Sequence, residues 1–163
     1  MIAAVRSTGN DDGVIGRDAL TEWAGYLLAA PLAACLAVVV LPPAGSLQEL
    51  AQRGAVAWGA ALLAGSGGVH LGVALAGGLA GPVAAVLAGT LATALIAAVA
   101  CLLGGQHALA LLVVATGGFW LYERRHFGTQ LPPAYLELRR HTTLASCALL
   151  AVLLCASAAA GLS

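Results

Sequence analysis

The feature that most constrains this chain is a succession of apolar runs, each about as long as a bilayer core is thick. A transmembrane helix needs about 20 consecutive, mainly apolar residues. Five such runs are separated by polar or turn-forming residues: 23–41, 54–76, 82–103, 105–122 and 142–162. We therefore predict an all-α fold, a polytopic membrane helix bundle of about five transmembrane helices.

Composition supports a lipid environment. Of the residues, 61% are apolar and 9% charged, against about 25% charged in soluble domains. All seven basic residues are arginines and are balanced by seven acidic ones. No basic tract could neutralise a nucleic-acid backbone, so we expect the lipid bilayer, and no nucleic acid, as a partner. The four cysteines lie in apolar runs without Cys-x-x-Cys spacing, and we expect neither disulfides nor a metal site.

The chain has two longer polar segments. One is the N-terminal segment (1–22), and the other (123–141) lies between the fourth and fifth runs. The second is predicted to be a loop with about one helical turn. With five spans both segments lie on one side of the membrane, together with six of the seven arginines, and Arg53 lies on the other. The positive-inside rule then places the N-terminus on the cytoplasmic or matrix side. The acidic N-terminal segment does not resemble a removable targeting sequence.

Small residues suggest where helices approach closely. Gly68 and Gly72 form a Gly-x-x-x-Gly pair in the second run, and such pairs let helix backbones pack tightly in lipid. The neighbour could be a helix of the same chain or another membrane protein. We expect packing within the chain as the simpler arrangement, and a partner subunit as the alternative.

His70 lies within the second run, where an ionisable side chain is a functional hypothesis by default. Three roles compete. The first is a neutral imidazole satisfied by a hydrogen bond across a helix interface. The second is a haem ligand, which needs a second axial ligand at similar depth. The third is a group that contacts a proton or a quinone, although the sequence places no Asp or Glu inside any run.

Ser66 precedes His70 by four residues, so the two side chains share a helix face. This pair could suggest a serine hydrolase. The surrounding residues lack a Gly-x-Ser-x-Gly turn and an orienting acid. We expect instead that Ser66 bonds to its own helix backbone, and we predict no catalytic residues.

Two sequence stretches together resemble a known family. Residues 67–72, Gly-Gly-Val-His-Leu-Gly, resemble a G-G-x-H-W-G signature, and residues 131–139, Leu-Pro-Pro-Ala-Tyr-Leu-Glu-Leu-Arg, resemble the start of a P-x-W-Y-L-x-L-R-x-x-L-T segment. Both belong to small membrane proteins labelled domain of unknown function 3429, which include transmembrane protein 69-like proteins. Leu71 and Ala134 stand where that pattern has Trp.

The resemblance implies a bacterial or mitochondrial inner membrane, and marks His70, Tyr135 and Arg139 as motif positions of unassigned role. Our first functional hypothesis is a non-catalytic accessory or assembly subunit of a larger energy-transducing complex, respiratory or photosynthetic, without a cofactor of its own. Its glycine-rich helix faces would contact other membrane subunits. The alternative is a small membrane carrier or redox protein that uses His70 to bind a quinone, haem or proton.

Overall fold

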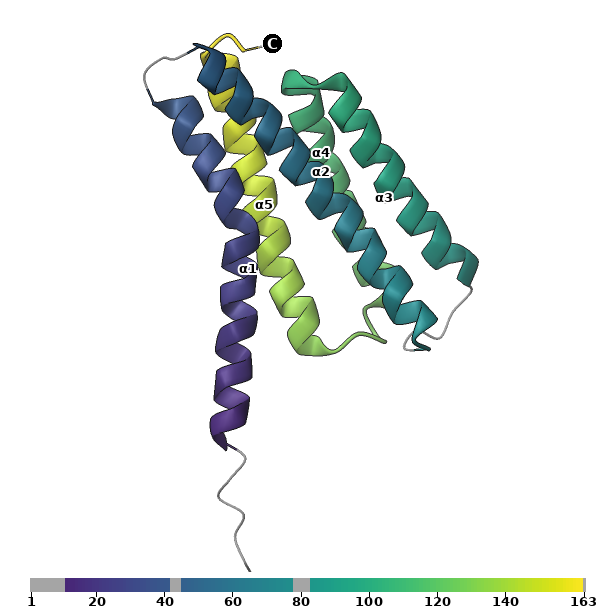
Figure 1. Ribbon diagram of the computed structural model, residues 1–163. Coiled ribbons are helices and arrows are strands. Elements are labelled where there is room, and N and C mark those ends of the chain that lie inside the picture. The colour runs from purple at the N-terminus through teal and green to yellow at the C-terminus, as the bar shows by residue number, and fades with distance from the viewer. Residues whose placement is uncertain (1–10, 42–44, 78–82, 163) are drawn as a thin grey trace, which may run out of the picture.

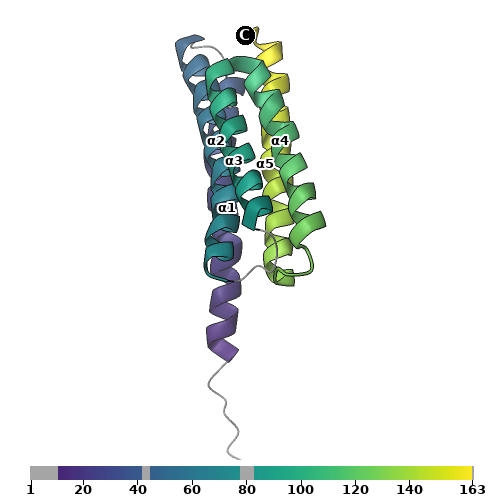
Figure 2. The same cartoon turned by 90° about the vertical axis from the view of Figure 1, so that its right-hand side faces the viewer.

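The computed structural model describes residues 11–41, 45–77 and 83–162, which form five helices (Figure 1). The helices are α1 (Asp11–Val40), α2 (Gly45–Leu75), α3 (Val83–Leu103), α4 (Gly105–Phe127) and α5 (Pro133–Ala159). They alternate in direction along the bundle, and the N-terminal turns of α1 extend beyond the other helices (Figures 1 and 2). The predicted all-α helical bundle is confirmed.

The helices form two layers. One layer holds α1, α2 and α3, and the other holds α4 and α5 (Figure 2). Helix α2 contacts all four other helices, whereas α1 contacts α2 and α5, and α3 contacts α2 and α4. The central position of α2 means that its inward side chains can meet residues from every other part of the bundle.

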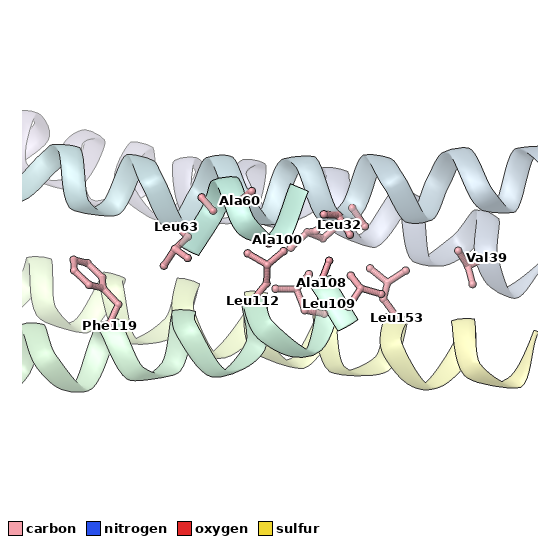
Figure 3. Packing of buried hydrophobic residues seen from close by; sticks show 14 residues of the cluster. Leu32, Val39, Ala60, Leu63, Ala100, Ala108, Leu109, Leu112, Phe119 and Leu153 are labelled. Atoms are coloured by element: carbon pink, nitrogen blue, oxygen red, sulfur yellow. The ribbon is translucent and has the colours of Figure 1, made fainter. Parts of the chain in front are cut away.

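A leucine-rich core lies between the layers (Figure 3). Leu109, Leu112 and Leu153 are completely buried, and Leu150 is nearly so. The outer surface is also apolar, with large exposed side chains such as Leu102, Leu75 and Val114. A bundle that is apolar on both its inside and its outside is typical of a protein surrounded by lipid.

Three helices, α2, α3 and α5, are long and apolar enough to cross a membrane. Within the described residues, α1 contributes a shorter apolar stretch, Gly25–Val40. Helix α4 is as long as a span, but its C-terminal turns carry Glu123 and two arginines, which lower its hydropathy. The chain is therefore a membrane protein whose described residues form five helices, three of them long and apolar enough to span a bilayer.

The polar segment 123–141 is not the predicted loop. Helix α4 continues to Phe127 and α5 begins at Pro133, so only residues 128–132 connect them. Helix α4 can continue because Glu123 and Phe127 point inward while Arg124 and Arg125 remain exposed. Proline suits the first turn of a helix, where its missing N–H costs no hydrogen bond.

Helix α2 is longer than the predicted 54–76 run, because it already begins at Gly45. The amide Nε2 of Gln48 donates hydrogen bonds to the carbonyls of Val39 at 3.0 Å and Leu41 at 3.2 Å. These bonds satisfy carbonyls at the C-terminal end of α1 that have no partner within the helix. Part of the predicted N-terminal segment, residues 1–10, lies outside the described residues.

Close packing inside the chain uses other glycines than the predicted pair. A Cβ at Gly67 would collide with Thr93 Oγ1 and lie 3.1 Å from Thr90 Cα, and one at Gly59 would lie 3.1 Å from Leu112. At Gly68 and Gly72 no described atom lies within 4 Å of a Cβ position, and both residues are exposed. The expectation that Gly68 and Gly72 pack against a helix of the same chain is wrong, because they face outward.

Candidate functional site

The most unusual group of side chains is a buried ionic cluster centred on Glu123. This residue belongs to the last turns of α4 and has no exposed surface. His70 reaches it from the C-terminal part of α2, and Arg139 from the second turn of α5. Three helices therefore meet at one carboxylate, near the end of the bundle where α2 and α4 finish and α5 starts (Figure 1).

Arg139 makes the charged contact that holds Glu123. Its Nε donates a hydrogen bond to Glu123 Oε2 at 3.2 Å. Charge-assisted hydrogen bonds of this kind are stronger than neutral ones. The cluster is thus not an isolated buried charge, which would be very costly, but an ion pair that joins α4 to α5.

His70 occupies the other carboxylate oxygen. Its Nε2 lies 3.2 Å from Glu123 Oε1, a distance within ion-pair range, although the two atoms are not aligned as a hydrogen bond. The second ring nitrogen, Nδ1, lies 2.8 Å from the backbone carbonyl of Ser66. Both nitrogens therefore face oxygen atoms, and neither is free to ligate a haem iron in this arrangement.

Aromatic rings enclose the imidazole. The ring of Phe119 lies 5.4 Å from that of His70 in an edge-on arrangement, and the ring of Phe127 lies 5.6 Å away. Only 4% of the His70 surface is exposed. This apolar enclosure keeps water away and strengthens the electrostatic interactions among His70, Glu123 and Arg139.

Tyr135 completes the cluster from the first turn of α5. Its hydroxyl lies close enough to the Glu123 carboxylate to interact with its charge. The three positions that the family resemblance marked, His70, Tyr135 and Arg139, thus come from two distant parts of the sequence and converge on one carboxylate.

Ser66 has a structural role in this arrangement. Its hydroxyl donates to the Leu62 carbonyl at 2.6 Å, as expected from its place in a helix, and its own carbonyl accepts from His70. The hydroxyl is not bonded to the imidazole, so a nucleophile–base pair is not formed. Gly68 and Gly72 lie outside the cluster on the exposed face of α2.

Glu123 is the functional candidate that the sequence reasoning missed, because the residue was assigned to a loop and no acid was expected inside a span. A helical signal does exist. The buried residues of the second half of α4 are spaced by three or four positions: Leu112, Thr116, Phe119, Glu123 and Phe127. This periodicity places Glu123 on the inner face of a continuous helix.

His70 lies near one end of its helix. The residue lies one and a half turns before the end of α2, which finishes at Leu75, and not in the middle of the helix. The cluster is consequently close to one end of the bundle. Among the described residues, no group of His, Cys, Asp or Glu side chains could hold a metal ion.

Comparison of the chain with family models, with curated proteins and with solved structures gives no match.

Proposed function

We propose that this chain is a small membrane binding or carrier protein that couples its ligand to a proton at the His70–Glu123 pair. The observation that supports this function is the position of both imidazole nitrogens. Nδ1 lies 2.8 Å from the Ser66 carbonyl, while Nε2 lies 3.2 Å from Glu123 Oε1.

A carbonyl oxygen can only accept a hydrogen bond, so Nδ1 must carry a proton. If His70 were neutral, Nε2 would then direct a lone pair at an ionised carboxylate, and the contact would be repulsive. The contact is attractive when the pair holds one additional proton, either on His70 or on Glu123. Because histidine exchanges its proton near neutral pH, such a pair can take up and release a proton.

The groups that face His70 from the neighbouring helices determine where this proton resides. Helix α4 contributes Glu123, and α5 contributes Arg139 and Tyr135. His126 lies at the exposed edge of the same aromatic cluster. Arg139 favours the ionised form of Glu123, which favours the additional proton on the imidazole. A ligand that binds the Arg139 guanidinium would weaken this preference and shift the proton from the imidazole towards Glu123.

The experiment follows the protonation of His70 by ¹⁵N NMR spectroscopy. In purified protein with ¹⁵N-labelled histidine titrated from acid to alkaline pH, we expect His70 to carry a proton on Nδ1 and to lose its Nε2 proton as the pH rises. Glu123→Gln should abolish this change, whereas Glu137→Gln, at an exposed glutamate, should leave it intact. A neutral His70 with its proton on Nε2 throughout that range would contradict the proposal.

A second candidate function is the accessory subunit of a larger inner-membrane, energy-transducing complex. The outward-facing glycines Gly65, Gly68 and Gly72 favour it, because they leave a flat face on α2 that no described residue covers. Another transmembrane helix could approach this face closely. Native gel migration of gently solubilised membranes tests this function. Co-migration with a large complex would support it, and migration as a monomer or small homo-oligomer would oppose it.

A further inference from the structure

A groove runs past the ionic cluster on the side of α1, α2 and α5. Its volume is about 440 Å³, at the smaller end of the range of about 300–1,000 Å³ for ligand pockets. Its walls are mainly apolar, and the residues that define it are Leu28, Trp58, Leu62, Val69, Tyr135 and Arg139. The groove is open on one side, so a molecule could enter it from the surrounding lipid.

The groove is elongated along α2. It extends from Trp58 to Val69, eleven residues of α-helix, which corresponds to about 17 Å at a rise of 1.5 Å per residue. The indole of Trp58 donates to the Leu28 carbonyl at 2.8 Å and so forms a fixed part of the wall. These dimensions suit a ligand with one extended alkyl chain better than a compact ligand.

The two ends of the groove differ in polarity. Arg139 and Tyr135 lie at the end where α5 begins, and Trp58 and Leu28 lie toward the other end. Arg139 uses only Nε to bind Glu123, and its two terminal NH₂ groups have no partner among the described residues. They are available to a ligand, and an arginine offers them in a geometry that matches a carboxylate or phosphate.

The surroundings of the polar end favour an anion. Between residues 123 and 141 the sequence has four arginines and two glutamates. Glu123 is already engaged by Arg139, and Glu137 by Arg140. Arg124 and Arg125 are exposed beside them. A negatively charged headgroup would therefore be attracted to this end of the bundle, and a positively charged one repelled.

We propose that the groove binds a single-chain amphiphile with an anionic headgroup, of the fatty-acid type. The headgroup pairs with the Arg139 guanidinium and the Tyr135 hydroxyl, and the chain lies along α2 toward Trp58. This inference rests on the proposed function and names its ligand class. Arg139 then connects the bound ligand to the proton site, because the same guanidinium contacts both the headgroup and Glu123.

Trp58 provides the measurement, because a brominated chain quenches the fluorescence of an indole that it touches. The chain has three tryptophans, so the background variant Trp23→Phe/Trp120→Phe leaves Trp58 as the only reporter. In nanodiscs of unbrominated zwitterionic lipid, we expect a dibrominated fatty acid to quench Trp58 saturably. Its neutral methyl ester should require at least a tenfold higher concentration.

A matched pair of variants tests the position of the ligand. Gly65 lines the groove, and Gly68 does not, yet both are exposed and have no described atom within 4 Å of a Cβ position. Gly65→Leu should fill the groove and abolish saturable quenching, while Gly68→Leu should preserve it. Neither substitution touches the ionic cluster, so both variants are expected to fold.

Several results would overturn the inference. These are equal quenching by the acid and its ester, equal behaviour of the two leucine variants, or quenching by a brominated two-chain phosphatidylglycerol but not by the free acid. Displacement of the acid by a neutral quinone at stoichiometric amounts would also reassign the ligand. The proton measurement on His70 is independent, so an unchanged His70 signal together with saturable quenching would locate the failure in the proposed proton coupling alone.

Discussion

Arg139 Nε and Glu123 Oε2 lie 3.2 Å apart and join the second turn of α5 to the last turns of α4. The carboxylate is completely buried, whereas 18% of the Arg139 side chain is exposed. Glu123 therefore depends on its two partners, Arg139 and His70, for charge compensation, whereas Arg139 is exposed enough to reach a ligand as well. This asymmetry makes the pair suitable for transmitting ligand binding to His70.

Glu123→Gln should destabilise the protein strongly. The amide cannot compensate Arg139 and His70, and breaking a buried ion pair costs about 3–5 kcal/mol. Glu137 forms an exposed pair with Arg140, and Glu137→Gln should cost less than about 1 kcal/mol. Unfolding in mixed micelles with increasing denaturing detergent measures both variants. Equal stability of the two variants would mean that the buried pair does not hold α4 to α5.

The double variant Glu123→Gln/Arg139→Gln should be less destabilised than the sum of its single variants. Each single change leaves a buried charge without its partner, whereas the double change removes both charges together. Contacting charged groups commonly show coupling of about 0.5–3 kcal/mol in such cycles. The same detergent titration measures this coupling, and strict additivity would argue that the two side chains act independently.

Gly67→Ala should loosen the packing of α2 against α3. A methyl group there would meet the Thr93 hydroxyl and lie 3.1 Å from Thr90 Cα, and overpacking of this kind typically costs about 1–3 kcal/mol. Gly68→Ala, one residue along, meets no described atom within 4 Å and should stabilise the helix by about 0.5–1 kcal/mol. Thermal unfolding in detergent compares the pair, and a similar loss in both variants would contradict the packing.

The helical bundle could be predicted from the sequence because apolar runs of bilayer length leave few other structures in lipid. The arrangement of the helices could not. Gly67 and Gly68 are adjacent and chemically identical. Which of them is buried depends only on which face of α2 is turned towards α3. The same uncertainty explains why Gly68 and Gly72 were expected inside the bundle.

The candidate site was predicted in part. His70 was recognised because its burial in an apolar run is unusual, and Tyr135 and Arg139 because of the family resemblance, which itself stays a prediction. Glu123 was overlooked because a charged cluster follows it immediately, and that cluster was interpreted as a loop. Extending the helical periodicity of Phe119 by one turn to Glu123 and by another to Phe127 would have placed the carboxylate inside.

The alternating helix directions predict on which side of the membrane each connection lies. Ser46, at the start of α2, and Thr129, between α4 and α5, are both exposed and lie at opposite ends of the bundle. In a variant with the four native cysteines replaced by alanine, Ser46→Cys should react with a membrane-impermeant maleimide added outside. Thr129→Cys should react only after permeabilisation, because the arginine-rich end is expected on the cytoplasmic or matrix side. The reverse pattern would invert the orientation, and labelling of both cysteines from one side would contradict the helix arrangement itself.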